Sequence, residues 1–388
     1  MSITLLSNII LSFIITYAVI PPIVRVSKAK NLMDVPDQRK LNKTVIPTLG
    51  GVAIFIGVNI STLVFLPNIR LTELRFLYAA IIMMFFTGLK DDLLIISARK
   101  KLMVQIAAST LLVVLGGFQI TQAYGLGGIS EFSPWVSIPL SIMVFLFLIN
   151  AVNLIDGIDG LAAGIGVLVS ATVGVWFYMT GFIGYAIIST ALAASLLAYL
   201  RFNLWGNSNK IFMGDTGSLI LGVLLGAIMI KFNELNVLTA NPFHFQQAPL
   251  FVVAMLIVPI TDTLRVFAVR IYHKKSPFSP DNNHIHHLLI KAGLSHIAAT
   301  AFLIGYTALF ALLALTFQLY INISVSFILL LSMSFSAIGW LNYKSKQYQK
   351  NQEKATEEES SKIIRLLPLG TKVAEEPGKL SKKKLLKV

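Results

Sequence analysis

Residues 136–160, VSIPLSIMVFLFLINAVNLIDGIDG, combine a membrane-type apolar run with a compact polar cluster. Residues 136–151 carry no charge and approach the length of about 20 mostly apolar residues that a helix needs to cross a bilayer. Asn153, Asp156 and Asp159 follow at i, i+3 and i+6, so on a helical turn they would share one face. Carboxylates and amides placed beside a bilayer cost free energy, so they usually mark a functional site. The stretch therefore predicts a spanning helix that ends in a functional site; the alternative is an inter-helix turn with Asp caps.

Apolar runs of this kind recur along most of the chain. Of 388 residues, 55% are hydrophobic and 13% are charged, whereas soluble domains average about 25% charged residues. With a mean hydropathy of +0.75, this composition excludes a soluble protein. We expect an all-α integral membrane protein with eleven transmembrane helices, near residues 3–22, 49–66, 74–88, 102–117, 136–151, 161–178, 183–200, 216–231, 249–268, 301–318 and 321–341. A count of ten or twelve would move the C-terminus to the other side.

The basic residues assign a side to each loop. With the N-terminus outside, the inner loops and the C-terminal tail hold 29 of the 32 Lys and Arg residues, and the outer segments keep only Arg70, Arg75 and Lys231. This is the positive-inside bias of cytoplasmic loops. The net charge of +14 is then an orientation signal, which argues against a nucleic-acid partner.

The organisation expected is one membrane domain followed by a tail. Residues 1–341 would form the transmembrane domain, and residues 342–388, rich in Lys, Glu, Ser and Gln, a poorly ordered cytoplasmic tail. The run 3–22 is interpreted as the first span and not as a cleaved signal peptide. The chain has no cysteine, which excludes disulfides, thiolate zinc sites and cysteine nucleophiles. All nine aspartates fall in or beside inner segments, which predicts a catalytic face.

Two further acidic motifs lie at expected helix ends. Asp91 and Asp92 follow an apolar run, and two adjacent carboxylates invite a cation; the alternative is a solvated helix end paired with Lys90 or Arg99. Gly214-Asp-Thr-Gly-Ser opens the eighth expected span. A helix N-terminus attracts phosphate, and Asp215 would either cap that helix or bind a divalent metal.

Histidines and cations complete the inner face. His284, His286 and His287 lie in the longest inner loop; contact with phosphate or a leaving group is the interpretation, and an exposed cluster the alternative. A carboxylate-rich site without cysteine favours magnesium over soft metals. A short interfacial helix is expected from His286 to Lys291. Each remaining cation has an alternative as an interface anchor, and Asp262 with Arg265 could be a simple i, i+3 pair; these cations are Lys43, Lys101, Arg265 and Arg270.

Carboxylates for magnesium, cations for phosphate and a glycine-backed helix end are what phosphoryl transfer needs, because positioning and charge neutralisation do most of that work. Magnesium holds few protein carboxylates and shares its coordination with substrate phosphates. A site at the membrane surface predicts one lipid-phosphate substrate and one water-soluble substrate.

The motifs, in order, resemble those of the polyprenyl-phosphate N-acetylhexosamine-1-phosphate transferases, the MraY/WecA/TagO superfamily of glycosyltransferase 4 type. The match covers roughly residues 30–295, and His-Ile-His-His is similar to the WecA/TagO branch. The matching motifs are Pro47-Thr-Leu-Gly-Gly, Asp91-Asp92, Asn153-x-x-Asp156-Gly-x-Asp159-Gly, Gly214-Asp-Thr-Gly-Ser and His284-Ile-His-His.

The resemblance implies a role for each residue. Asp215, with Asp156 nearby, would bind Mg²⁺, for which Mn²⁺ could substitute. Asp91 and Asp92 would deprotonate or position the lipid phosphate. The remaining catalytic candidates are Asp156, His286 and His287, and the substrate-binding candidates are Lys43, Lys101 (with Lys100 as a rival), Asn153, Asp159, Arg265 and His284, with Arg270 nearby.

The reaction implied is UDP-N-acetylglucosamine plus undecaprenyl phosphate giving undecaprenyl-diphospho-N-acetylglucosamine plus UMP, at the cytoplasmic face of the bacterial inner (plasma) membrane. It would initiate a cell-envelope glycan such as O-antigen or teichoic acid. Direct attack and a phospho-aspartate intermediate both stay open, as do another UDP-N-acetylhexosamine donor and a homodimer. A secondary transporter of an anionic solute is the alternative from another class.

Overall fold

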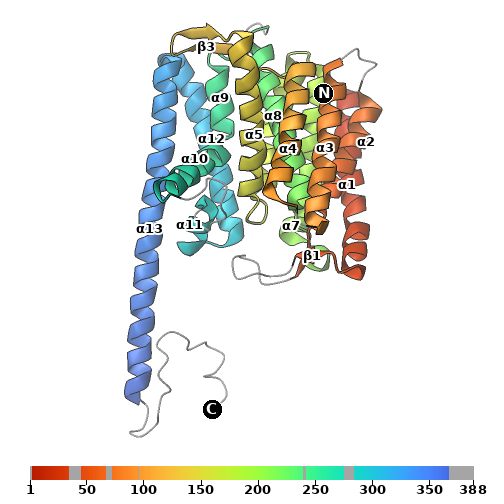
Figure 1. The fold of residues 1–388 in the computed structure, drawn as a ribbon. Helices are drawn as coiled ribbons and strands as arrows, with labels where there is room; N and C mark the ends of the chain where they lie inside the picture. The colour runs from red at the N-terminus through yellow and green to blue at the C-terminus, as the bar shows by residue number, and fades with distance from the viewer. Residues whose placement is uncertain are drawn as a thin grey trace.

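The computed structural model describes residues 2–34, 45–66, 72–94, 96–238, 242–274 and 284–366. Long helices run side by side through most of the molecule (Figure 1). Within the described ranges, seven helices are long and apolar enough to cross a membrane, or eight if one bent pair counts as a single span. The seven are α1 (Ile3–Ala29), α5 (Pro134–Ile155), α6 (Leu161–Met179), α7 (Ile183–Trp205), α8 (Gly214–Asn236), α12 (His296–Tyr320) and α13 (Ile323–Leu366). The expected all-α membrane fold is confirmed.

Three further helices coincide with expected spans. They are the shorter apolar helix α2 (Gly50–Phe65), the more charged α3 (Thr72–Leu94), and α4 (Ala98–Thr110) with its continuation through the π-helical turn η1 (Leu111–Leu115). In Figure 1 these helices lie alongside α1 and α8.

The ninth expected span, 249–268, is not one straight helix. The chain forms α9 (Ala248–Met255) and α10 (Ile257–Tyr272), which are bent by 73° at Leu256. Pro259 stands in the first turn of α10, and a proline has no N–H to donate to the preceding turn, which favours a break before it. A single straight span here was therefore wrong.

Short elements occupy the two ends of the bundle. The strands β1 (Met33–Asp34) and β2 (Ile46–Pro47) pair antiparallel, and β3 (Gln122–Leu126) pairs antiparallel with β4 (Ile129–Glu131). The β3–β4 hairpin lies at the end of the bundle opposite to β1 and to α11 (Ile285–Lys291) (Figure 1). A 3₁₀ turn, η2 (Asn207–Asn209), separates α7 from α8.

α13 extends much further than the sequence indicated. Residues 342–366 were expected to be poorly ordered, but they continue α13 to Leu366, and this part projects beyond the bundle in Figure 1. The stretch is rich in Lys, Glu and Gln, contains no Gly or Pro, and such straight-chain residues favour a helix even where nothing packs on them. The expectation of a poorly ordered tail from residue 342 onward is therefore wrong as far as Leu366.

Polar side chains join α1 to α7. Asn8 Nδ2 donates to the Ile187 carbonyl at 2.9 Å, and Ser12 Oγ donates to the Ala191 carbonyl at 2.7 Å. One turn further, the Thr16 and Ser195 hydroxyls lie 2.8 Å apart. Small polar residues of this kind join helices in membranes, because the hydrophobic effect does not drive helices together within lipid.

Glycines bring α2 and α8 into backbone contact. Gly51 N donates to the Met213 carbonyl at 2.9 Å. A Cβ at Gly51 would overlap the backbone of Gly217 and lie 2.7 Å from the carbonyl carbon of Thr216. The glycines of the Pro47-Thr-Leu-Gly-Gly motif therefore seat the start of α2 on the start of α8.

The replacement Gly51→Ala should lower the thermal unfolding temperature in detergent, because its methyl group has no space and overpacking typically costs about 1–3 kcal/mol. Gly305→Ala is the matched control, since no atom lies within 4 Å of a Cβ built there and alanine favours helix α12. Differential scanning fluorimetry of both variants measures the effect. Equal unfolding temperatures would contradict this account of the packing.

Candidate active site

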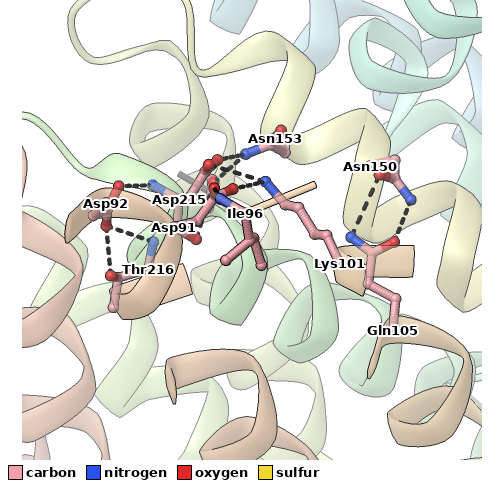
Figure 2. Close-up of polar contacts among 10 residues, drawn as sticks. Asp91, Asp92, Ile96, Lys101, Gln105, Asn150, Asn153, Asp215 and Thr216 are labelled. Atoms are coloured by element: carbon pink, nitrogen blue, oxygen red, sulfur yellow. Dashed lines mark hydrogen bonds and ion pairs between the residues drawn. The ribbon is translucent and has the colours of Figure 1, made fainter. Parts of the chain in front are cut away.

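The N-terminus of α8 is capped by a residue from α3. Asp92 Oδ1 accepts the N–H of Asp215 at 2.8 Å, and Oδ2 accepts the N–H of Thr216 at 2.9 Å and the Thr216 hydroxyl at 2.5 Å (Figure 2). A Cβ at Gly214, whose φ is +70°, would lie 2.6 Å from Asp92 Oδ2, so a glycine is needed here. Asp92 thus supplies the acceptors that the first N–H groups of a helix lack.

Because Asp92 forms the cap, the side chain of Asp215 is left for other contacts. Its Oδ1 accepts a short hydrogen bond from Asn153 Nδ2, and Asn153 also donates to Ser218 Oγ at 2.8 Å. Its Oδ2 lies 3.0 Å from Lys101 Nζ. The capping alternative for Asp215 is therefore wrong.

Lys101 joins two carboxylates. Its Nζ lies 3.0 Å from Asp91 Oδ2 as well as 3.0 Å from Asp215 Oδ2. Asp91 Oδ1 accepts the backbone N–H of Ile96 at 2.8 Å. Lys101 lies in the first turn of α4 and its side chain is 15% exposed, whereas Lys100 is exposed. The geometry thus favours Lys101 over its rival (Figure 2).

The loop after α5 is a turn rather than a continued helix. α5 ends at Ile155, so Asn153 lies in its last turn while Asp156 and Asp159 follow outside it. The three do not share one helical face. Among the described residues, none donates a hydrogen bond or forms an ion pair to the Asp156 carboxylate. Burial, and then the charges of nearby carboxylates led by Asp215, raise the pKa of Asp156 well above its usual value.

Asp159 is held by Lys210, which lies in the connection between α7 and α8. Its Oδ2 forms an ion pair with Lys210 Nζ at 2.6 Å, and its carbonyl accepts the Thr300 hydroxyl at 2.7 Å. Lys210 precedes α8, so this pair ties the α5–α6 turn to the α7–α8 connection. No motif in the sequence marked Lys210 as a partner of Asp159.

The histidine helix α11 is anchored by Asp262. This buried carboxylate accepts the N–H of Ile285 at 2.8 Å on Oδ1 and contacts His284 Nδ1 at 2.9 Å through Oδ2. Arg265 lies 3.1 Å from Oδ1, so the expected i, i+3 pair exists, but the main role of Asp262 is to hold α11 against α10. The short helix expected from His286 to Lys291 is present as α11, and its Ile285, Leu288 and Leu289 side chains are buried.

His286 reaches the α5–α6 turn. A Cβ at Gly157 would lie 2.7 Å from His286 Cε1, so the imidazole packs directly on the glycine that follows Asp156. The His286 and His287 rings have centroids 4.4 Å apart. Burial, followed by the charge of His287, lowers the pKa of His286 to about 3, so this side chain is neutral at physiological pH.

The structure therefore brings most of the sequence candidates together, although it does not test their roles. Arg270 is buried near the end of α10, and Lys43 lies outside the described residues. Residues that sequence reasoning missed are Thr216, Ser218 and Lys210. Thr216 and Ser218 stood inside the motif Gly214-Asp-Thr-Gly-Ser, so the motif itself was the available signal.

Carboxylates that could hold a divalent cation are present. Asp156 has no partner among the described residues, and the charge of nearby Asp215 raises its pKa. Their oxygens are the ligands that magnesium prefers, and magnesium commonly uses one or two carboxylates plus substrate phosphates. Within the part of the chain that the structure describes, no three His, Asp or Glu side chains form a ready-made metal site.

Comparisons with known proteins cover most of the chain. Residues 74–233 match the family model described as glycosyl transferase family 4. A Bacillus subtilis protein named probable undecaprenyl-phosphate N-acetylglucosaminyl 1-phosphate transferase is 31% identical, with coverage of 88% of this chain and 96% of that protein. A Yersinia pestis undecaprenyl-phosphate alpha-N-acetylglucosaminyl 1-phosphate transferase is 30% identical, with coverage of 80% and 83%. A Mycolicibacterium smegmatis decaprenyl-phosphate N-acetylglucosaminephosphotransferase is 33% identical, with coverage of 67% and 69%.

Asp92→Asn should lower the unfolding temperature more than Asp91→Asn does. An amide can accept only one of the two backbone N–H groups and turns its own N–H₂ toward the other, and losing a helix cap costs about 1–2 kcal/mol. Thermal unfolding of both variants in the same detergent measures the difference. An unchanged unfolding temperature for Asp92→Asn would show that the cap contributes nothing.

The thermal stability of the protein should fall as the pH is lowered below about 6.5, partly because of His286. An unfolded histidine binds a proton near pH 6.5, whereas folded His286 does so only near pH 3. The unfolded state thus gains protons first, and stability decreases as the pH falls through this window. His286→Gln should make the decline between pH 7 and pH 5 shallower in thermal scans. The same change at exposed His273 should leave the slope as it is.

Proposed function

The chain belongs to glycosyl transferase family 4, as its ordered motifs predicted, and from that membership we propose that it transfers N-acetylglucosamine 1-phosphate from UDP-N-acetylglucosamine to undecaprenyl phosphate. The products are undecaprenyl-diphospho-N-acetylglucosamine and UMP. The names of the Bacillus subtilis and Yersinia pestis relatives support this reaction, because the match spans 96% and 83% of those proteins.

One observation carries the proposal at the level of the site. Lys101 lies 3.0 Å from both Asp91 and Asp215 at the N-terminus of α8, and the free carboxylate of Asp156 is close enough to interact with Asp215. A cation beside carboxylate oxygens suits a diphosphate substrate and the metal ion that accompanies it.

In the proposed reaction, an oxygen of the lipid phosphate attacks the β-phosphorus of the nucleotide sugar. A new phosphorus–oxygen bond forms to the lipid, and the bond between the β-phosphorus and the bridging oxygen breaks, so that the electron pair leaves on UMP. Lys101 is placed to neutralise charge on the phosphates. Asp92 uses both carboxylate oxygens to cap α8, so we assign it to holding the site together rather than to taking a proton. A phosphate monoester is largely deprotonated near neutral pH and does not depend on a strong base.

We further propose that Asp215 and Asp156 hold Mg²⁺ when the donor is bound. The ion would neutralise the diphosphate and the departing UMP, as in other phosphoryl transfers. Asn153 orients Asp215 through its short hydrogen bond, and Lys210 fixes the turn that carries Asp156 by binding Asp159.

The histidines are proposed to contact the phosphates or the sugar. Neutral His286 is buried on Gly157 with its Nδ1 unpaired among the described residues. His284 is committed to Asp262, so His287, which is only partly buried, is the more accessible of the three for a substrate oxygen. Arg265 and Arg270 lie on α10, the helix that carries Asp262.

The site is proposed to face the cytoplasm of the bacterial inner membrane. If α2, α3 and α4 with η1 also cross the bilayer, they bring the eight spans counted with the bent pair to eleven. That count places the ends of α3 and α5 and the starts of α4 and α8 on one side, together with most Lys and Arg residues. A cytoplasmic site suits a nucleotide-sugar donor, and the lipid product would then prime an envelope glycan.

Purified protein with radiolabelled UDP-N-acetylglucosamine, undecaprenyl phosphate and Mg²⁺ should form a labelled lipid and release UMP, while a panel of other UDP-N-acetylhexosamines identifies any preferred donor. Asp215→Ala should reduce UMP release by about a hundredfold or more, because charge stabilisation at the reacting phosphates is lost. Glu131→Ala, at an exposed position of the hairpin at the opposite end, is the control. Full activity of Asp215→Ala would place the metal elsewhere, and labelled nucleotide sugar entering vesicles without a lipid product would favour a transporter.

A further inference from the structure

Two polar side chains outside the reacting cluster join α4 to α5 by a reciprocal amide pair. Asn150 Nδ2 donates to Gln105 Oε1 at 2.9 Å, and Gln105 Nε2 donates to Asn150 Oδ1 at 3.4 Å. Asn150 also donates to the Leu146 carbonyl of its own helix at 2.7 Å. Figure 2 shows the pair beside the acidic cluster.

The spacing of the pair links it to the site. Gln105 comes four residues after Lys101 on α4, and Asn150 comes three residues before Asn153 on α5. Positions three or four apart lie on one face of a helix. The two helices are therefore joined at two successive levels: the amide pair at one level, and Lys101, Asp215 and Asn153 at the next.

α4 itself has few buried side chains, and the large apolar anchors Leu112 and Val113 lie in its continuation η1, further from Lys101. Of residues 98–110, only Gln105, Ala108 and Ser109 are buried, so α4 itself buries no large apolar side chain. Met103 and Ile106 are 62% and 42% exposed. Yet Lys101, in the first turn of this helix, must stay within 3.0 Å of two carboxylates on α3 and α8.

Gln105 is a buried polar residue of that helix whose side chain bonds a neighbouring helix, whereas buried Ser109 Oγ has no partner among the described residues. Gln105 is 1% exposed. Because the two side-chain amides bond each other at both ends, they fix the axial position and the rotation of α4 relative to α5. A slip of α4 by one residue would break the pair and carry Lys101 away from Asp215.

We propose that Gln105 and Asn150 are positioning residues that set Lys101 against Asp91 and Asp215 for the transfer reaction. The inference rests on the proposed function, because it assumes that Lys101 acts on the substrate phosphates. It assigns neither amide a contact with substrate. Both act through the placement of α4.

A double-mutant cycle on the purified full-length protein tests this proposal. Gln105→Leu removes the amide at similar size, Lys101→Met removes the cation, and kcat for labelled lipid formation is measured for wild type, both single variants and the double variant. Gln247→Leu is the matched control. Gln247 is also buried and donates to the Ile321 carbonyl at 2.6 Å, but it lies at the start of α9, away from the acidic cluster.

We expect Gln105→Leu to lower kcat by on the order of tenfold to a hundredfold, as small misplacements in active sites do. In the Lys101→Met background the same change should lower kcat by less than about threefold, because interdependent residues are not additive. Gln247→Leu should change kcat by the same factor in the wild-type and the Lys101→Met backgrounds. The exchange Gln105→Asn with Asn150→Gln keeps a reciprocal amide pair and should recover most of the lost rate.

The proposal is overturned if Gln105→Leu and Lys101→Met act multiplicatively, or if the exchange variant is no better than Gln105→Leu although folded by gel filtration. It is also overturned if neither Gln105→Leu nor Asn150→Leu can be purified folded while Gln247→Leu can, since the pair would then serve folding alone. A wild-type protein that forms no labelled lipid would instead refute the proposed function, so the two failures are distinct.

Discussion

The cap that Asp92 places on α8 is the interaction on which the site depends. A helix that begins inside a bundle has N–H groups without partners, and in a membrane protein these must be satisfied internally. Asp92 satisfies two of them, which fixes the end of α3 against the start of α8. Because Asp91 is the preceding residue, the same contact brings its carboxylate to Lys101, and it releases the side chain of Asp215 from any capping role.

α3 and α8 are also joined at their far ends. Lys231 forms an ion pair with Glu73 at 2.7 Å and donates to the Gly117 carbonyl at 3.1 Å, while Glu234 accepts the N–H of Thr121 at 3.0 Å. Between these ends, a Cβ at Gly88 would overlap the backbone of Thr216. Two helices that are tied at both ends and packed closely near the site form a rigid support for the side chains of the acidic cluster.

Periodicity and composition were sufficient to place the expected spans on helices, except that 249–268 is divided between α9 and α10, because a run of apolar residues has few alternatives in a bilayer. They did not reveal the partners of the acidic residues. Capping rules consider residues just before a helix, whereas Asp92 is 123 residues from Asp215 in sequence, and Asp262 reaches Ile285 across 23 residues. The break before Pro259 could not be read from proline alone, since Pro21, Pro22 and Pro139 also lie in expected spans but within continuous helices. The polar stretch after residue 341 was misread because solvation was taken for disorder, although its residues favour a helix.

The long final helix also has a mechanical consequence. Tyr348 packs against Gly293, where a Cβ would lie 2.8 Å from the ring carbon Cζ, so α13 leaves the bundle braced by the turn that follows the histidine helix. From Tyr343 to Leu366, at 1.5 Å per residue, α13 would extend about 36 Å. It therefore forms a semi-rigid helical extension on the side of the bundle where α11 lies (Figure 1).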